Sequence, residues 1–225
     1  MSWHLDELAH AGPEHLDAAF VAGFDERMPT DWSEEVAALL AQGIGRTSKV
    51  VDLGAGTGTF AQAIAPEVRR VVAVDLSEAM VAHMRAQGLE AVRAGFLSYD
   101  HAGDPPDAVF TSNALHHLPD YWKTVALERI AGMLRPGGIL RVRDFIYSFE
   151  AAEADQVMAR WVAAGLAAGW HESDLAQHIL SEYSTFTWLF EPMLEHAGFE
   201  IRERTLDPNQ VQAAYTCIRT SRRPS

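Results

Sequence analysis

The sequence predicts an α/β protein whose core is a doubly wound, mostly parallel sheet with an antiparallel last strand. Two observations support this prediction. Short β-branched, apolar runs alternate with helical segments through the middle of the 225-residue chain, which is typical of parallel strands covered on both faces. Near the end, the turn signal Asp207-Pro208-Asn209 separates two further strands, and strands joined by a tight turn are antiparallel.

The expected elements follow one another in a simple order. Residues 1–47 form N-terminal helices, including an Ala/Leu-rich helix over Glu34–Gln42. Residues 48–149 contain the expected strands Lys49–Leu53, Arg70–Val74, Glu90–Arg93, Ala108–Thr111 and Ile139–Arg143. The helices expected between these strands are Thr59–Ala65, Ser77–Gln87 and Tyr121–Leu134. Residues 150–197 form a helical insertion that we expect to be a lid, and residues 198–225 close the sheet with the strands Phe199–Thr205 and Gln210–Arg219.

Composition and charge exclude several classes of protein. Hydrophobic residues make up 48% of the chain, which is enough for a sizeable core and excludes a disordered protein. There are 18 Lys and Arg against 31 Asp and Glu, a net charge of −13, which disfavours electrostatic binding to nucleic acid or anionic membranes. Basic residues are scattered apart from Arg219, Arg222 and Arg223. We therefore expect a small-molecule substrate rather than a nucleic acid.

Location and assembly follow from what the chain lacks. No run approaches the roughly 20 apolar residues of a membrane span, and the first residues do not resemble a secretory signal. Cys217 is the only cysteine, which excludes an intrachain disulfide and disfavours a thiolate metal cluster. We expect a cytoplasmic monomer or homodimer that does not bind membranes and has no metal site.

The segment VVDLGAGTG, Val50–Gly58, indicates a ligand site, because an expected strand runs directly into a glycine-rich turn and a helix. Gly54, Gly56 and Gly58 allow a tight turn and a close approach of the backbone to a ligand. Asp75 ends the next strand about 20 residues later, where an acid suits the hydroxyls of a ribose. The alternative is that Asp75 only caps the following helix.

Asp52 narrows the choice of ribose ligand. It precedes Gly54 by two residues, and the glycines have the spacing GxGxG rather than the GxGxxG of dinucleotide folds. A carboxylate there would repel a pyrophosphate but suits a ligand with an amino group. The pattern therefore favours a nucleoside joined to an amino acid, with a nicotinamide dinucleotide as the alternative.

Four blocks, in this order and spacing, resemble those of a known family: VVDLGAGTG, VVAVDLSEAM, FTSNALHHLPD and MLRPGGIL. Together they resemble the class I S-adenosylmethionine-dependent methyltransferases, which have a seven-stranded Rossmann-like sheet with a reversed last strand. The resemblance covers about Lys49 to Asp144 and is nearest to the small bacterial YrrT-like and ubiquinone-methyltransferase-like type. It implies methyl transfer from S-adenosylmethionine by in-line displacement, with S-adenosylhomocysteine as product.

The resemblance also implies which residues bind the cofactor. The first block would hold the methionine end, Asp75 the ribose, and Leu76 with Met80 the adenine, although Met80 equally suits a helix core. The implied set is Asp52, Gly54, Ala55, Gly56, Gly58, Asp75, Leu76, Met80, Gly95, Phe96, Leu97 and Asn113. Two positions depart from the family: Gly95 stands where an Asp usually meets the adenine amino group, and Phe24 where relatives often have Tyr.

Candidates for contact with the acceptor lie at the carboxyl edge of the sheet, where ligands of such folds bind. His116 and His117 follow the fourth strand and Asp144 ends the fifth, so these are the candidate catalytic residues. Neighbouring histidines do not easily face one cleft together, so one of them should pack or cap a helix. Asp144 equally suits a carboxylate satisfied by loop amides.

The insertion and the N-terminal helices supply an expected aromatic substrate pocket. Its candidate residues are Phe24, Tyr147, His171, Tyr183 and Trp188. The alternative is that these side chains simply hold the lid on the sheet. Two other functions stay open at this point: methyl transfer to tRNA or protein, and cofactor binding without catalysis.

Overall fold

The computed structural model describes residues 4–220, and its core is a seven-stranded sheet in the order β3-β2-β1-β4-β5-β9-β8. The strands are β1 (Lys49–Leu53), β2 (Arg70–Asp75), β3 (Ala91–Arg93), β4 (Ala108–Ser112), β5 (Ile139–Asp144), β8 (Phe199–Leu206) and β9 (Ala213–Arg219). The first five are parallel, and β9 runs antiparallel to both β5 and β8. The predicted fold class is confirmed. Arg222 and Arg223 of the expected basic cluster lie outside the described residues.

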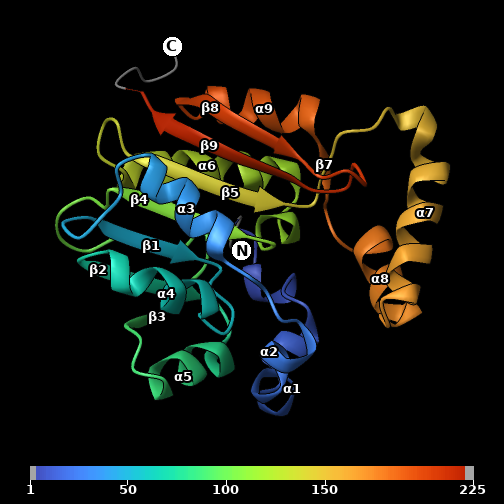
Figure 1. Ribbon diagram of the computed structural model, residues 1–225, viewed down its shortest axis with the longest axis horizontal. Helices are drawn as coiled ribbons and strands as arrows, with labels where there is room; N and C mark the ends of the chain where they lie inside the picture. The colour runs from blue at the N-terminus through green and yellow to red at the C-terminus, as the bar shows by residue number, and fades with distance from the viewer. Residues whose placement is uncertain (1–3, 221–225) are drawn as a thin grey trace.

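Helices cover both faces of this sheet (Figure 1). On one face are α3 (Ser33–Ala41), α4 (Thr59–Ile64) and α5 (Glu78–Ala86), and on the other are α6 (Asp120–Met133) and α9 (Thr187–His196). Successive residues of β1 point to opposite faces, so Val50 packs with α3 and α4, whereas Val51 packs with α6. Because helices cover both faces of the sheet, neighbouring residues of β1 such as Val50 and Val51 are both apolar.

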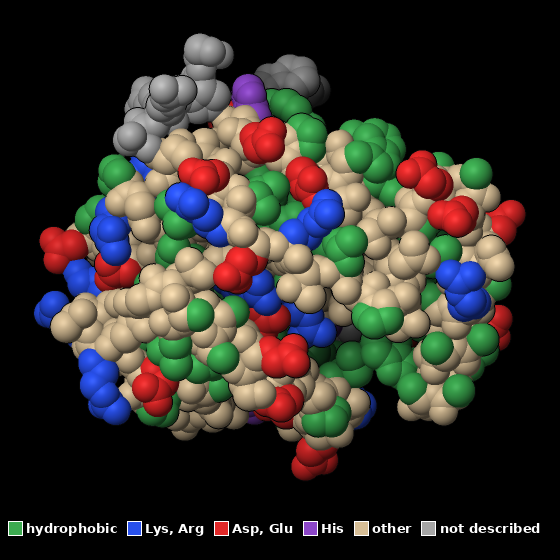
Figure 2. Space-filling model, turned by 45° about the horizontal axis from the view of Figure 1, so that its top comes forward, with side chains coloured by type: hydrophobic (Ala, Val, Ile, Leu, Met, Phe, Trp, Pro, Cys, Tyr) green, Lys and Arg blue, Asp and Glu red, His purple; other side chains and the backbone are tan. Residues whose placement is uncertain are grey.

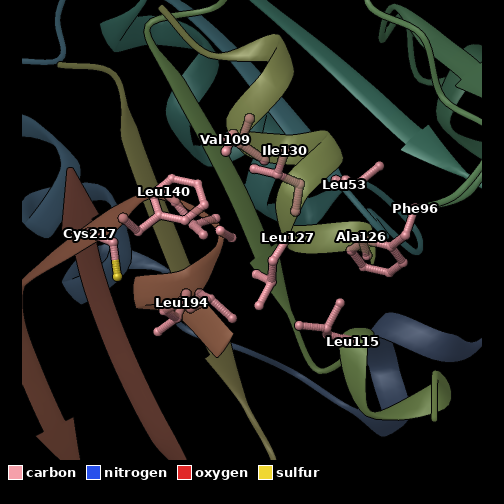
Figure 3. Close-up of a cluster of buried hydrophobic side chains, with 14 of the residues drawn as sticks. Leu53, Phe96, Val109, Leu115, Ala126, Leu127, Ile130, Leu140, Leu194 and Cys217 are labelled. Carbon is pink, nitrogen blue, oxygen red and sulfur yellow. The ribbon is translucent and has the colours of Figure 1, made fainter. Parts of the chain in front are cut away.

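The larger core cluster lies between the sheet and the helices α6 and α9 (Figure 3). Leu127 from α6 and Leu194 from α9 are fully buried there against Leu140 of β5. Cys217 of β9 belongs to the same cluster, and burial raises the pKa of its thiol to about 12. A thiol in this setting is a packing residue rather than a reactive group.

The N-terminal segment lies across the carboxyl ends of the parallel strands. It contains the short 3-10 helices Glu7–Ala9 and Pro13–Leu16, followed by α1 (Ala18–Ala22) and α2 (Phe24–Arg27). Figure 1 shows α1 and α2 beside the end of the sheet from which α4 and α5 begin. This segment therefore forms one wall of whatever site the strand ends create.

The segment expected to be a lid divides into two parts. The helices α7 (Ala154–Ala167) and α8 (Glu172–Leu180) stand to one side of the sheet (Figure 1). In contrast, α9 packs directly on the sheet through Phe190 and Leu194, which are 1% and 0% exposed. Two short strands, β6 (Ile146–Tyr147) and β7 (Thr185–Phe186), pair with each other in parallel where the excursion leaves and rejoins the core.

Two details of the sequence prediction change. The last strand begins at Ala213 rather than at Gln210, because residues 207–212 form a turn in which Gln210 has a φ of 66°. The β6–β7 pair was not expected, since two residues give no recognisable pattern. Within residues 4–220, none of the helices is both long enough and apolar enough to cross a lipid bilayer.

Candidate functional site

A cleft of about 220 Å³ lies at the carboxyl ends of β1, β2 and β4. Three connections that follow these strands line it: the glycine turn of residues 54–57, the segment Asp75–Ser77 and the segment 112–114. The N-terminal segment closes the opposite side with apolar side chains that include Phe24, Met28 and Trp32. The cleft therefore has the position that ligand sites take in open parallel sheets.

The glycine turn is shaped by packing as well as by backbone freedom. Gly54 and Gly58 have φ angles of 76° and 83°, and a Cβ at either would meet a neighbouring side chain at 2.5–2.6 Å. Gly56, with a φ of 56°, has nothing within 4 Å of its Cβ position, so its backbone borders open space. Gly58 precedes α4 and packs against Met84 and Leu89 instead of lining the cleft.

Asp75 holds the turn and borders the cleft at the same time. Its Oδ2 accepts a hydrogen bond from the amide of Gly56 at 2.8 Å, and its Oδ1 accepts one from the amide of Ser77 at 2.8 Å. Burial raises the pKa of Asp75 to about 6, although these hydrogen bonds act in the opposite direction. Both of its oxygens retain an unused lone pair, so the carboxylate has the capacity to bind two ligand hydroxyls.

Asp52 is the least satisfied acid of the cleft. It is 2% exposed, and its Oδ2 has no hydrogen-bond partner among the described residues. Burial, together with the negative charge of Asp75, raises the pKa of Asp52 to about 8. A buried, orphaned carboxylate next to a second acid requires a donor or a positive charge, and a ligand with an ammonium group supplies both.

Glu7 fills the position that Gly95 leaves open. A Cβ on Gly95 would lie 2.5–2.7 Å from the three carboxylate atoms of Glu7. Both oxygens of Glu7 accept from the amide of Leu97 at 3.1 Å, and the side chain of Ser98 lies next to them. Glu7 is 8% exposed and lines the cleft with Phe96. A carboxylate is thus present at this position, but it comes from residue 7.

The segment after β4 separates the two neighbouring histidines. Asn113 has a φ of 48°, a conformation that Asn tolerates, and it lines the cleft together with His117. His116 instead is 2% exposed and packs beneath, with its Nδ1 at 2.5 Å from Asp144 Oδ1. The expectation that one histidine of the pair packs away from the cleft agrees with this arrangement.

Asp144 is fully engaged by its surroundings. Its Oδ2 accepts from the amide of Leu115 at 2.8 Å, and its Oδ1 accepts from the amide of Phe145 at 2.7 Å as well as facing His116. It is 2% exposed and does not line the cleft. The structure therefore makes Asp144 an anchor for the turn after β4, which is the alternative left open by the sequence.

The two histidines have opposite electrostatic environments. Burial, followed by the neighbouring His116, lowers the pKa of His117 to about 3, so its ring is neutral. Burial alone would lower the pKa of His116 too, but the carboxylates of Asp144 and Glu182 outweigh it and raise that pKa to about 9. A neutral His117 in the cleft wall offers a hydrogen bond without introducing charge.

The predicted substrate residues are not gathered into one pocket. Phe24 lines the cleft, whereas Tyr147 stacks on Phe149 in a separate cluster beside β6 and β7. His171 is exposed at the start of α8, and Tyr183 and Trp188 are 39% and 59% exposed. In this conformation, the cleft contacts the N-terminal segment rather than α7 and α8.

Comparison with known proteins agrees with this geometry. Residues 50–138 match the family described as the methyltransferase domain. An uncharacterised methyltransferase of Mycobacterium bovis is 30% identical over 54% of this chain and 62% of its own length. One from Bacillus pumilus is 26% identical over 80% of this chain and 82% of its own. Among solved structures, magnesium protoporphyrin IX methyltransferase from Synechocystis PCC 6803 has a TM-score of 0.67 at 14% identity, covering 98% of this chain and 100% of that one.

Residues 50–138 therefore resemble a methyltransferase domain, and the chain has the fold of solved class I methyltransferases. S-Adenosylmethionine is therefore the cofactor that this family implies. The matches span only 52% and 62% of the length of the first curated relatives.

The cleft fits the cofactor that the methyltransferase family implies. The orphaned Oδ2 of Asp52 suits the ammonium group of the methionine part, and the free lone pairs of Asp75 suit the ribose. Of the expected cofactor residues, all line the cleft except Gly58 and Leu97, which pack or donate next to it. Sequence reasoning missed Glu7. The available signal was Gly95, a glycine without a positive φ, which indicates that another group occupies its side-chain space.

Proposed function

We propose that the cleft binds S-adenosylmethionine and that the chain transfers its methyl group to a small organic acceptor. The observation that supports this most directly is the pair of carboxylates, buried Asp52 and half-buried Asp75, on either side of the glycine turn. The Oδ2 of Asp52 has no hydrogen-bond partner among the described residues, and both acids have raised pKa values, so a ligand with an ammonium group and two vicinal hydroxyls stabilises both.

Glu7 extends this proposal to the adenine. Its carboxylate lies beside the Phe96 backbone and lines the cleft, where it would accept a hydrogen bond from the adenine amino group. In the family this contact is made by an acid at the position of Gly95. The N-terminal segment thus supplies a group that the third strand lacks, and the cofactor site is complete only when this segment is docked.

Surface charge supports a small acceptor rather than a nucleic acid. The chain has a net charge of −13, and Figure 2 shows Lys and Arg side chains interspersed with Asp and Glu over the face in view. Binding to a phosphate backbone relies on a concentrated basic surface.

The bound cofactor supplies an activated methyl group on a sulfonium, with a neutral leaving group. The residues of the chain orient the acceptor and exclude water. Phe24, Met28 and Trp32 provide an apolar wall, and the uncharged ring of His117 provides a hydrogen bond. Such a site suits an acceptor that does not need a strong base.

Calorimetry with S-adenosylmethionine and S-adenosylhomocysteine tests the cofactor site. We expect both to bind the wild type, and we expect Asp75→Asn or Asp52→Asn to weaken binding about 10- to 100-fold, since each removes hydrogen bonds to a charged group. Asp104→Asn is the matched control, because Asp104 is exposed outside the cleft and loses the same charge.

The outcomes are distinct. Failure of the wild type to bind either compound contradicts the proposal, as does binding that the two cleft variants leave unchanged. Thermal-shift measurements with a nicotinamide dinucleotide test the alternative ligand. Formation of S-adenosylhomocysteine in the presence of a panel of small acceptors then separates a transferase from a protein that only binds the cofactor.

A further inference from the structure

A cluster of three ligand-type side chains lies beside the cleft, between the sheet edge and α8. His116 comes from the short helix after β4, His178 from the last turn of α8, and Glu182 from the segment that follows it. Their ring nitrogens and carboxylate oxygen all lie within 4.8 Å of one another. The sequence did not predict a metal site, and His116 is more than 60 positions away from His178 and Glu182 in the chain.

The separation of His116 from Glu182 suits two ligands of a shared cation. His116 Nε2 and Glu182 Oε2 are 3.3 Å apart, and His178 Nδ1 contacts the same Glu182 oxygen. Two ligand atoms that each lie 2.0–2.2 Å from a tetrahedral zinc ion are separated by about 3.4 Å. Neither His178 Nδ1 nor Glu182 Oε2 forms a hydrogen bond of acceptable geometry with any described residue, although both atoms are buried.

A fourth residue orients the first ligand. Asp144 Oδ1 faces Nδ1 of His116 at 2.5 Å, which leaves Nε2 directed toward Glu182. A metal-binding histidine usually donates a hydrogen bond from the N–H of its second ring nitrogen to such a carboxylate, which fixes the tautomer and the ring orientation. Because Asp144 engages Nδ1, Nε2 is the nitrogen of His116 that is left to bind an ion shared with Glu182.

The cluster contains two buried carboxylates whose charge a cation would offset. The side chains of Asp144 and Glu182 are 2% and 9% exposed, and they lie against the imidazoles of His116 and His178. The nearest buried lysine, Lys123, is held by Asp120 at 2.7 Å and by the carbonyl of Tyr183. A protonated His116 offsets one of the two negative charges, whereas a divalent cation offsets both.

Aromatic rings surround the cluster and limit its contact with bulk water. The ring of Phe145 lies 4.3 Å from His178 and 5.2 Å from His116, measured between centroids, and Trp161 of α7 lies 6.0 Å from His178. An apolar shell of this kind strengthens the interaction of a cation with its ligands.

We propose that His116, His178 and Glu182 bind a divalent transition-metal ion of the zinc type. Two imidazoles and one carboxylate form a ligand set that suits zinc and leaves one coordination position open. The ion connects α8 to the turn after β4, where the backbone amide of Tyr183 also donates to the carbonyl of His116 at 2.8 Å. The ring of His117, which lines the cleft, lies 4.4 Å from that of His116, so the ion holds the insertion next to the cofactor site.

Metal binding to the full chain tests this site without S-adenosylmethionine, so the result does not depend on the proposed function. The protein is dialysed against a chelator and then titrated with Zn²⁺ by calorimetry and with Co²⁺ by visible absorption. We expect one Zn²⁺ per chain and the intense visible bands of four- or five-coordinate Co²⁺. His178→Ala and Glu182→Gln should weaken Zn²⁺ binding at least about tenfold. His171→Ala is the matched control, because His171 begins the same helix but lies outside the cluster.

Each outcome decides the matter. The proposal is wrong if the wild type does not bind Zn²⁺ in a one-to-one ratio, or if both cluster variants bind as tightly as His171→Ala. Weakened binding counts as support only when circular dichroism shows that the variants are folded. If they are not folded, the Co²⁺ spectrum of the wild type decides alone: visible d–d bands of low-coordinate Co²⁺ support the site, and the weak spectrum of the hydrated ion contradicts it.

Discussion

Gly95→Asp tests whether Glu7 has taken over the side-chain space of the third strand. Gly95 does not have a positive φ, so its backbone accepts any residue, and the carboxylate of Glu7 is the obstacle to a side chain. A Cβ there would lie 2.5–2.7 Å from three atoms of that carboxylate. The substitution therefore forces Glu7 out of its position and places a second acid beside it.

The expected loss in the free energy of unfolding follows from the contacts that Glu7 makes. Displacement removes its hydrogen bonds from the amide of Leu97, and hydrogen bonds to a charged group contribute about 1.5–3 kcal/mol. Crowding and like-charge repulsion add to this, so Gly95→Asp should lower the free energy of unfolding by about 2–4 kcal/mol. Glu7→Ala alone should cost about 1.5–3 kcal/mol. The double variant should cost no more than Glu7→Ala, because the obstacle is gone.

Urea denaturation of the three variants and the wild type provides the assay. We expect the summed costs of the two single substitutions to exceed the cost of the double variant by about 2–4 kcal/mol. Gly45→Asp is the control, since nothing lies within 4 Å of its Cβ position, and it should change stability by less than about 0.5 kcal/mol. Additivity of the two substitutions, or a harmless Gly95→Asp, would refute the reasoning.

Two further predictions concern buried acids. Burial raises the pKa of Asp52 to about 8, so the folded chain keeps a proton that the unfolded chain releases, and the free energy of unfolding falls as the pH rises from about 4 to about 8. Asp52→Asn should remove this slope, which is at most about 1.4 kcal/mol per pH unit. Urea denaturation across that pH range measures the free energy of unfolding of both proteins. Parallel pH curves for the variant and the wild type would contradict the prediction. Glu35 lies 2.6 Å from Arg141, with both side chains 7% exposed, so Glu35→Ala should cost about 3–5 kcal/mol. Glu90→Ala removes an exposed pair and should cost less than about 1 kcal/mol; equal urea midpoints for the two would show that burial does not matter.

The sequence predicts the sheet well because each strand is a local pattern. All seven strands lie where the β-branched runs place them, with ends that shift by at most three residues. The sequence does not show which helices of the insertion belong to the core. The spacing of apolar residues in α9 does not reveal whether this helix packs on the sheet or on α7. Phe190 and Leu194 lie in the main core, and only the tertiary structure decides that.

The site was predictable where one strand and its following turn define it. The glycine turn, Asp75 and Asn113 belong to this group. Glu7 and Glu182 do not, because each reaches its position from a helical segment distant in sequence. His178 and Glu182 have the i, i+4 spacing of a common solvent-exposed pair, so nothing local distinguishes them.

The parallel pairing of β6 with β7 brings the two ends of residues 148–184 together. The paired strands hold the two ends of this loop together. The entropic cost of closing the loop therefore depends only weakly on its length, and a doubling of the length adds about 0.6 kcal/mol. Helices of other lengths and sequences are thus interchangeable at this position without a change in strand order or in the cofactor cleft. A change confined to this module therefore leaves the seven-stranded sheet and the cleft at its strand ends as they are.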